Sequence, residues 1–254
     1  NKMLRTIFQK IFSIFGYKII KKINTYSFDT IYKKEIKESP IIFDVGANRG
    51  QSIERFRRNF PNCIIHCFEP LEQEFEILKK RYSDDKNIHL NNFALGEKEG
   101  YKIFYTTAKS ENSSFNKLNL NTDWIKIRSK QYKTNQEKFI LNEKNVKIKK
   151  LDDYCIEMNI SSIDILKLDT SGFEHQILLG AKNMIKKNNI HSIETEFMFD
   201  NVYETKTSFY EFEKEIVNDN FRIYAIDHIK GFKSIYEYMF GVYALYFNEK
   251  YKKK

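Results

Sequence analysis

Three residues that could bring a ligand close to the backbone follow an apolar run near the start of the chain. The run IIFDV spans residues 41–45, and Gly46, Asn48 and Gly50 come directly after it, before the amphipathic stretch QSIERFRRNF. This order predicts a buried strand, a tight turn and a helix N-terminus. Glycine in such a turn lets a ligand approach bare backbone, and the first helical turn offers unpaired N–H donors.

A carboxylate follows at the position where nucleoside-binding proteins commonly hold a ribose. The next apolar run, IIHCFEP, ends in Glu69, about twenty residues after the glycines. An acid at this place typically accepts hydrogen bonds from the two ribose hydroxyls. The pairing of turn and acid therefore predicts a nucleoside site.

The spacing of the turn indicates which nucleoside. A diphosphate-binding turn follows the pattern G-x-G-x-x-G, but Asn48 replaces its middle glycine here. Asp44 could accept hydrogen bonds from the ammonium group of a cationic ligand, or from N–H groups of the turn itself. S-adenosylmethionine joins a ribose to a positively charged amino-acid part, so it fits better than a dinucleotide. The alternative is that Gly46 and Gly50 only turn a strand into a helix.

Composition indicates a folded domain with a basic surface. The chain has 254 residues, 41% hydrophobic content and a formal net charge of +9. That is enough for one large α/β domain, or for one domain with an extension. The charge could attract nucleic acid, anionic lipid or a phosphorylated substrate, although scattered lysines are more often solvated surface. Cys63, Cys67 and Cys155 form no C-x-x-C pair, so we expect buried thiols in a reducing cytoplasm.

The first 38 residues differ from the rest, so we divide the chain into an extension (1–38) and a domain (39–254). Apolar residues recur at helical spacing from Ile7 to Ile19, with lysines and Arg5 around them. Such a basic amphipathic helix could lie on the inner face of a membrane as a peripheral contact. It could instead pack on the domain or on a second subunit, as in a homodimer, and we favour packing.

The middle of the chain interrupts the alternation of strands and helices. A helix over 71–82 is followed by a strand, a turn and a returning strand over 87–105. Residues 106–148 are polar and rich in lysine, with a helix-like stretch over 123–138 that contains Trp124. We expect this insert to cover a substrate pocket, because long connections in compact domains are often functional; a mobile surface loop is the alternative.

The remaining segments complete a sheet. The run 163–168 predicts a buried strand that ends at Asp169, before Gly172 and a helix carrying Glu174. Another strand over 191–197 contains Glu194 and Glu196. A helix over about 209–217 precedes strands over 221–227 and 242–248, which could pair as an antiparallel hairpin at the sheet edge.

Several motifs together resemble one family. DVGANRGQS, CFEP, NNFALGEKEG, the pair Ser113 and Ser114, KKLDDYC and IDILKLDTSGFEHQILLGA match the motif series of FkbM-type methyltransferases in order and spacing. The resemblance implies an α/β, Rossmann-like class I methyltransferase with a mostly parallel seven-stranded sheet, S-adenosylmethionine as cofactor, and O-methylation of a sugar, polyketide or similar small molecule. One departure is Thr170-Ser171, where many members carry an acid before the glycine.

Position and resemblance together give a set of expected site residues. Asp44 and the turn would surround the methionine part, Glu69 the ribose, and Asn92 and Ala94 the adenine. The residues expected to bind the cofactor are Asp44, Gly46, Ala47, Asn48, Gly50, Ser52, Glu69, Pro70, Asn92, Ala94 and Asp169.

Methyl transfer to an alcohol needs a group that removes the hydroxyl proton. Asp169 is the main candidate, although it could instead cap a helix or stabilise a turn. Glu196 and His228 are further catalytic candidates. Asp169 and Glu196 could also hold Mg²⁺ with an acceptor diol, which we consider less favoured because nothing clearly completes the ligand set.

The sequence favours a small-molecule O-methyltransferase, whose acceptor we expect to be a sugar of a surface glycan or glycolipid. Trp124, Tyr203 and Phe209 could stack on a sugar face. The charge leaves an RNA methyltransferase as an alternative, but an N-P-P-Y element and an arginine-rich stripe are missing, so no nucleic-acid partner is expected. A non-catalytic nucleoside-binding scaffold is the third hypothesis.

Overall fold

The structure is a computed structural model that describes residues 12–14, 27–135, 139–199, 201–230 and 241–251. Its centre is a seven-stranded sheet with the order β3-β2-β1-β7-β8-β10-β9. The strands are β1 (Ile41–Val45), β2 (Ile64–Phe68), β3 (Ile88–Asn91), β7 (Ile163–Leu168), β8 (Ile190–Met198), β9 (Phe221–Lys230) and β10 (Gly241–Asn248). Strand β10 runs antiparallel to both of its neighbours, and the other pairs are parallel. The predicted fold class, including the C-terminal hairpin, is therefore confirmed.

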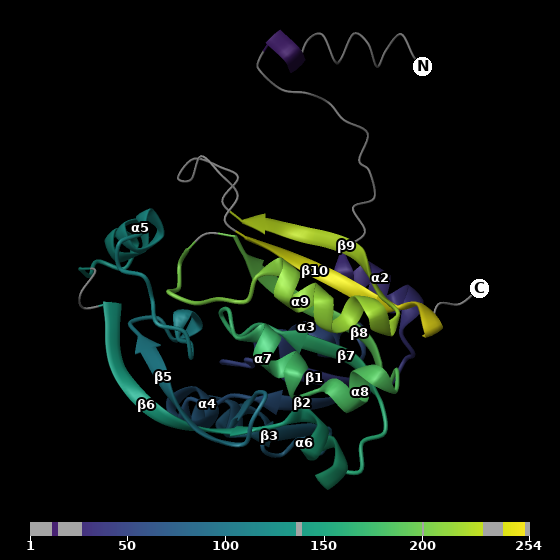
Figure 1. The fold of residues 1–254 in the computed structure, drawn as a ribbon. Helices are drawn as coiled ribbons and strands as arrows, with labels where there is room; N and C mark the ends of the chain where they lie inside the picture. Colours follow the sequence, from purple (N-terminus) through teal and green to yellow (C-terminus); the bar gives the residue numbers. More distant parts are fainter. Residues whose placement is uncertain (1–11, 15–26, 136–138, 200, 231–240, 252–254) are drawn as a thin grey trace.

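Helices cover both faces of this sheet (Figure 1). One face packs on α2 (Phe28–Glu35), α3 (Gln51–Asn59) and α4 (Glu72–Tyr82). The other face packs on α6 (Leu151–Glu157), α7 (Glu174–Leu179), α8 (Lys182–Lys186) and α9 (Phe209–Ile216). Alternate residues of one strand serve the two layers, since Ile42 belongs to the first core and Phe43 to the second. This is why the parallel strands read as continuous apolar runs.

The strand order reverses direction between β1 and β7. From β1 the chain moves through α3 to β2 on one side, and from β7 it moves through α7 and α8 to β8 on the other. The two connections diverge at the carboxyl ends of the strands and leave a crevice between them. Gly46, which follows β1, and Asp169, which follows β7, both lie at that crevice.

A second, smaller sheet lies around the stretch predicted as a polar insert, and only its last strand falls mostly within that stretch. Its strands β4 (Ala94–Leu95), β5 (Gly100–Thr107) and β6 (Ile140–Lys149) have the order β4-β6-β5. Helix α5 (Asp123–Gln131) is shorter than the helix-like stretch we predicted over 123–138, and Lys133 beyond it has a φ of 53°. Trp124 belongs to a separate core cluster of Leu118, Trp124, Ile125, Phe139, Val202 and Tyr203. The hairpin was missed because its strands pair across a long polar connection.

Part of the predicted N-terminal extension packs on the sheet. Helix α2 begins at the cap Ser27 and buries Phe28, Ile31 and Tyr32 against the first core. The basic amphipathic stretch from Ile7 to Ile19 lies outside the described residues except for residues 12–14. No helix within the described residues is long and apolar enough to cross a membrane. The choice between membrane contact and packing therefore stays a prediction.

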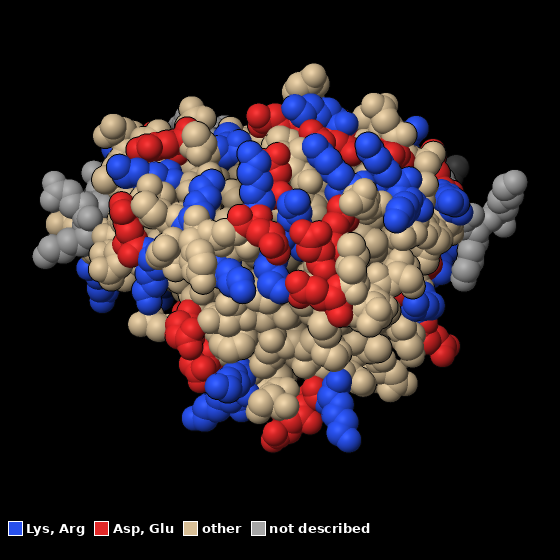
Figure 2. Space-filling model, turned by 60° about the horizontal axis from the view of Figure 1, so that its bottom comes forward, with Lys and Arg blue, Asp and Glu red and all other residues tan. Residues whose placement is uncertain are grey.

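Charged side chains of both signs are mixed on the face seen in Figure 2. Lysine and arginine side chains lie among acidic ones there, and no continuous stripe of one sign crosses that face. On this face the basic side chains are thus separate groups beside acidic ones, as expected for solvated surface. The three cysteines are free and buried, as expected.

Candidate active site

The turn after β1 is fixed by the neighbouring strands. The N–H groups of Gly46 and Ala47 both donate to the carbonyl oxygen of Phe68, over 3.0 and 3.1 Å. Gly46 has a φ of +83°, and a Cβ added there would lie 2.1 Å from the carbonyl oxygen of Asp169. Only glycine can occupy this position, because a side chain would collide with the backbone that follows β7. The turn therefore lies directly against the end of the neighbouring strand.

Gly50 has a different role. It is the N-terminal cap of α3, with a φ of +90°, and an added Cβ would lie 2.7 Å from the ring of Tyr82. The constraint comes from packing against α4. These contacts agree with the alternative given above for Gly50, in which the glycine serves to turn the strand into the helix.

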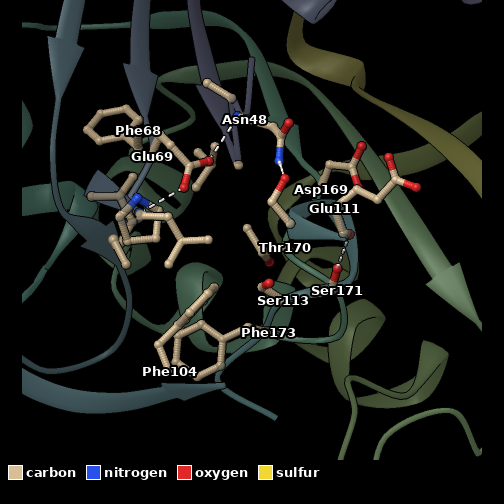
Figure 3. Close-up of a pocket in the computed structure, with 18 of the residues that line it drawn as sticks. Asn48, Phe68, Glu69, Phe104, Glu111, Ser113, Asp169, Thr170, Ser171 and Phe173 are labelled. Atoms are coloured by element: carbon tan, nitrogen blue, oxygen red, sulfur yellow. Dashed lines mark hydrogen bonds between the residues drawn. The ribbon is translucent and has the colours of Figure 1, made fainter. Parts of the chain in front are cut away.

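Glu69 lies at the carboxyl end of β2 and is held by the turns on either side of it. Its Oε2 accepts from the N–H of Asn48 over 2.9 Å, and its Oε1 accepts from the N–H of Leu71 over 2.8 Å (Figure 3). The residue is 5% exposed, and burial raises the pKa of Glu69 to about 7, against the opposing effect of the two backbone donors. A carboxylate with fixed orientation thus faces the crevice.

A cavity of about 250 Å³ fills the crevice between these turns and the second sheet. One part is apolar and is lined by Phe68, Leu71, Leu95, Phe104, Phe115 and Phe173. Figure 3 shows Phe104 and Phe173 together on one side, Glu69 on another, and Asp169 and Glu111 at the end opposite Glu69. Flat apolar walls with a few placed polar groups are typical of small-ligand sites.

The end of the cavity near Asp169 contains buried charges. Lys167 Nζ lies 3.1 Å from Asp44 Oδ1 and 3.4 Å from Asp169 Oδ2. Burial alone would lower the pKa of Lys167, but Asp44 and Asp169 outweigh it and hold that pKa above its usual value. The hydroxyl of Tyr243 also donates to Asp169 Oδ2, over 3.3 Å.

The segment around the 3-10 helix Ser110–Asn112 (η1) crosses the cavity and is tied to both sides of it. Asn48 Nδ2 donates to Ser110 Oγ over 3.2 Å, and Ser171 Oγ donates to the carbonyl oxygen of Glu111 over 3.3 Å. Ser114 Oγ donates to the carbonyl oxygen of Ser171 over 2.8 Å. The serine pair of the sequence motif therefore includes a hydroxyl that joins this segment to the loop after β7.

Glu174, the acid of the motif that follows β7, is buried and hydrogen-bonded to the loop before α7. Its Oε1 accepts from the N–H groups of Thr170 and Gly172, over 2.9 and 3.2 Å, and the residue is 1% exposed. These bonds fix the loop between Asp169 and α7. Glu174 therefore acts on the shape of the site and does not line the cavity.

The structure brings most of the predicted cofactor residues together. The cavity is lined by Gly46, Ala47, Asn48, Ser52, Glu69, Pro70, Ala94 and Asp169. Asp44, Gly50 and Asn92 are not among the residues that line it. Asn92 supports the cavity wall, because its Nδ2 donates to the carbonyl oxygen of Glu69 over 3.0 Å.

The other catalytic candidates lie outside the cavity lining. Glu196 is on β8, 9% exposed, and opposite Tyr243 in the sheet register. His228 is on β9, with β8 and β10 between its strand and β7, and its side chain is outside the described part of the structure. The described residues contain no group of three or more His, Cys, Asp or Glu that could hold a metal ion. The Mg²⁺ hypothesis therefore gains no third ligand here.

Several cavity residues were missed at the sequence level. They are Lys167, the aromatic residues Phe104, Phe115 and Phe173, and Ser110 and Glu111 of the crossing segment. A lysine in a strand with buried neighbours on both sides, as in ILKLD, was the signal for Lys167, because an unpaired buried ammonium is costly.

Comparison with known proteins agrees with this site. Residues 44–223 match the methyltransferase FkbM domain family. The 2-O-methyltransferase NoeI of Sinorhizobium fredii (strain NBRC 101917 / NGR234) is 24% identical over 173 residues, which are 66% of this chain and 67% of that relative.

A solved structure shows the same fold. The crystal structure of methyltransferase FkbM from Methylobacillus flagellatus KT has a TM-score of 0.50 and 15% identity, over 82% of this chain and 44% of that chain. This chain thus spans less than half the length of the crystallised protein. Since the family match covers most of the residues, including the turn, Glu69 and Asp169, the chain belongs to the FkbM family of S-adenosylmethionine-dependent methyltransferases.

Proposed function

We propose that the chain transfers a methyl group from S-adenosylmethionine to a hydroxyl of a sugar, in a surface glycan or glycolipid. The observation that carries this proposal is the fixed carboxylate of Glu69 facing the same cavity as Asp169. The name of the relative NoeI, a 2-O-methyltransferase, supports O-methylation.

The residues around the cavity fit the parts of this cofactor. Glu69 would accept hydrogen bonds from the ribose hydroxyls, because its carboxylate oxygens have further lone pairs beside those used by Asn48 and Leu71. The apolar walls, with Phe104 and Phe173, would enclose the adenine ring. The turn from Gly46 to Asn48 would border the methionine part. When bound, the cofactor supplies a methyl group already activated by its sulfonium.

Asp169 is the proposed general base. It lies at the end of β7, beside the turn and opposite Glu69 in Figure 3, and its side chain is 30% exposed. With cofactor and acceptor bound, Asp169 would take the hydroxyl proton of the acceptor as the acceptor oxygen accepts the methyl group that the cofactor would supply. Alignment of the acceptor supplies much of the remaining catalysis.

The acceptor side of the cavity is polar. Glu111, Ser113, Thr170 and Ser171 line the cavity near Asp169, and their oxygens could hold neighbouring hydroxyls of a sugar. A polyol suits this environment better than an anion, because the carboxylates of Glu111 and Asp169 would repel a phosphate group. The crossing segment would limit entry of water during transfer.

The test is a search for the methylated product. Purified protein is incubated with methyl-labelled S-adenosylmethionine and either a metabolite and glycan extract or total RNA, and the products are separated and weighed by mass spectrometry. We expect label in a sugar-containing molecule that gains the mass of one CH₂, and at least a hundredfold less with Asp169→Asn, on the order of what a general base contributes. Label in RNA alone, or in neither, would overturn the proposal.

We also propose a cytoplasmic location, in which residues 1–24 either pack on the domain or touch the inner face of a membrane. The three buried free thiols support a reducing compartment. Flotation with anionic liposomes, with and without residues 1–24, separates the two roles. Equal flotation of both chains would remove the membrane contact.

A further inference from the structure

One carboxylate oxygen at the end of the cavity is held by two donors from different strands. Asp169 Oδ2 lies 3.4 Å from Lys167 Nζ on β7 and 3.3 Å from the hydroxyl of Tyr243 on β10. The side chain of Lys167 is 6% exposed, so its ammonium group lies inside the protein and away from bulk solvent. Two converging donors restrict the orientation of the Asp169 carboxylate.

The lysine is itself held in place from the other side. Its Nζ lies 3.1 Å from Asp44 Oδ1, and the two residues are opposite each other in the β1–β7 register. Asp44 is completely buried and therefore supplies a counter-charge that water cannot provide there. The strand before the glycine turn is thus linked through Lys167 to the acid after β7.

Tyr243 remains a hydrogen-bond donor in this arrangement. Burial, and next the negative charge of Asp169, raise the pKa of Tyr243 well above its usual value. Its hydroxyl therefore keeps its proton at neutral pH. A neutral hydroxyl and an ammonium group both favour the ionised form of a carboxyl partner.

We propose that Lys167 and Tyr243 clamp Asp169 as an anion beside the reacting sulfur, so that the site binds S-adenosylmethionine more tightly than S-adenosylhomocysteine. This inference rests on the proposed placement of the cofactor in the cavity. Lys167 and Tyr243 act as positioning residues, and the negative charge of Asp169 discriminates between the two ligands. The two ligands differ only in the methyl group and its positive charge, so a fixed negative charge nearby favours the sulfonium. Loss of that charge on transfer weakens binding and promotes exchange of product for fresh cofactor.

The experiment measures a ratio of two affinities. Calorimetry gives the Kd of S-adenosylhomocysteine and the Kd of S-adenosylmethionine for each protein, and the first is divided by the second. Contacts to the ribose, adenine, ammonium and carboxylate are common to both ligands and cancel in this ratio. A general loosening of the fold weakens both and leaves the ratio unchanged.

Two variants test the clamp, and a third serves as their control. Asp169→Asn removes the charge and should lower the ratio about tenfold. Tyr243→Phe removes one donor and should lower it in the same direction, about two- to threefold. Tyr246→Phe is the matched control, because Tyr246 lies on the same strand, is 1% exposed, and donates to Glu213 instead. Its ratio should equal that of the wild type. Lys167→Met leaves Asp44 buried without a counter-charge and can fail to fold, so Tyr243→Phe is the decisive clamp variant.

The possible outcomes distinguish failure of the clamp from failure of the proposed function on which it rests. An unchanged ratio in Asp169→Asn, or equal changes in the two tyrosine variants, would overturn the clamp while both ligands still bound. Failure of the wild type to bind either ligand would overturn the proposed function, and the clamp with it.

Discussion

Two buried glutamates of this protein are held in opposite ways. Glu69 faces the cavity, is 5% exposed, and accepts from two backbone N–H groups. Glu194, on β8, is 2% exposed and accepts two bonds from Arg55, over 2.6 and 2.8 Å, and one from Tyr32 over 2.8 Å. One carboxylate is oriented by neutral donors, and the other is neutralised by a guanidinium.

The difference separates a ligand site from a structural one. The Arg55 guanidinium joins Glu194 to Asp29, and so connects α3 with β8 and α2. The guanidinium thus neutralises the charge of Glu194 within the protein. Among the described ion pairs none involves Glu69, so its charge is available to a ligand hydroxyl. Buried acids in one sheet thus differ in function according to whether a cation or the backbone holds them.

The largest expected effect is the loss of stability when the Arg55–Glu194 ion pair is broken. Arg55→Met leaves Glu194 buried with only the Tyr32 donor, and it should lower the free energy of unfolding by about 3 to 5 kcal/mol. Urea denaturation measures the loss. Lys126→Ala is the control, because Lys126 forms an exposed pair with Asp123 and should cost less than about 1 kcal/mol. A loss in Arg55→Met no larger than the control would contradict a structural role for this pair.

The second effect is on cofactor binding. Glu69→Gln removes the charge that would accept the ribose hydroxyls, and it should weaken S-adenosylmethionine binding about 10- to 100-fold by calorimetry. Stability should change much less than in Arg55→Met. Glu72→Gln, at an exposed position three residues later, should leave the Kd unchanged. If Glu69→Gln bound the cofactor as tightly as the wild type, Glu69 would lose its assignment.

The pH dependence sharpens the contrast. The pKa of Glu69 is raised from 4.5 to about 7 by burial, so the folded protein binds its proton more tightly than the unfolded chain does. Its contribution to stability is therefore complete below its unfolded pKa and is lost as the pH rises through 7. Cofactor affinity should change the opposite way and weaken about tenfold from pH 8 to pH 6, because the ionised form accepts the hydroxyls. The check is to measure the Kd of the cofactor from pH 6 to pH 8 for the wild type and for Glu69→Gln. The wild-type Kd should change with pH more than that of the variant, and parallel curves for the two proteins would contradict this assignment.

The smallest effect concerns the second donor to Glu194. Tyr32→Phe removes a single hydroxyl and should lower the free energy of unfolding by about 1 kcal/mol, with the cofactor Kd unchanged. Tyr210→Phe, at a 75% exposed residue, should have no measurable effect on stability. A cofactor Kd that shifted in Tyr32→Phe would show that the two regions are coupled.

The sequence predicted what depends on neighbours along the chain. The apolar runs of β1 and β2, the glycine turn and the acid at the end of β2 are local patterns, and the structure places Gly46 and Glu69 at one cavity. The end of β7 and its acid Asp169 followed from the same logic. These elements obey strand periodicity and the geometry of parallel sheets.

The rest depends on contacts that are distant in sequence. Phe104 reaches the cavity because β5 pairs with β6 across more than thirty intervening residues, which no local pattern encodes. The polarity of that connection suggested an insert that covers the pocket and hid the buried Trp124. Lys167 stood out only as a lysine within an apolar run, and its partner Asp44 lies on another strand, so the sequence did not show what it pairs with.

A crystal structure with S-adenosylhomocysteine bound would test the central claim most directly. We expect the ribose hydroxyls within hydrogen-bond distance of Glu69, the adenine between the apolar walls that include Phe104 and Phe173, and the sulfur directed toward Asp169. A ligand bound elsewhere, or bound in this cavity with its ribose away from Glu69, would contradict the account.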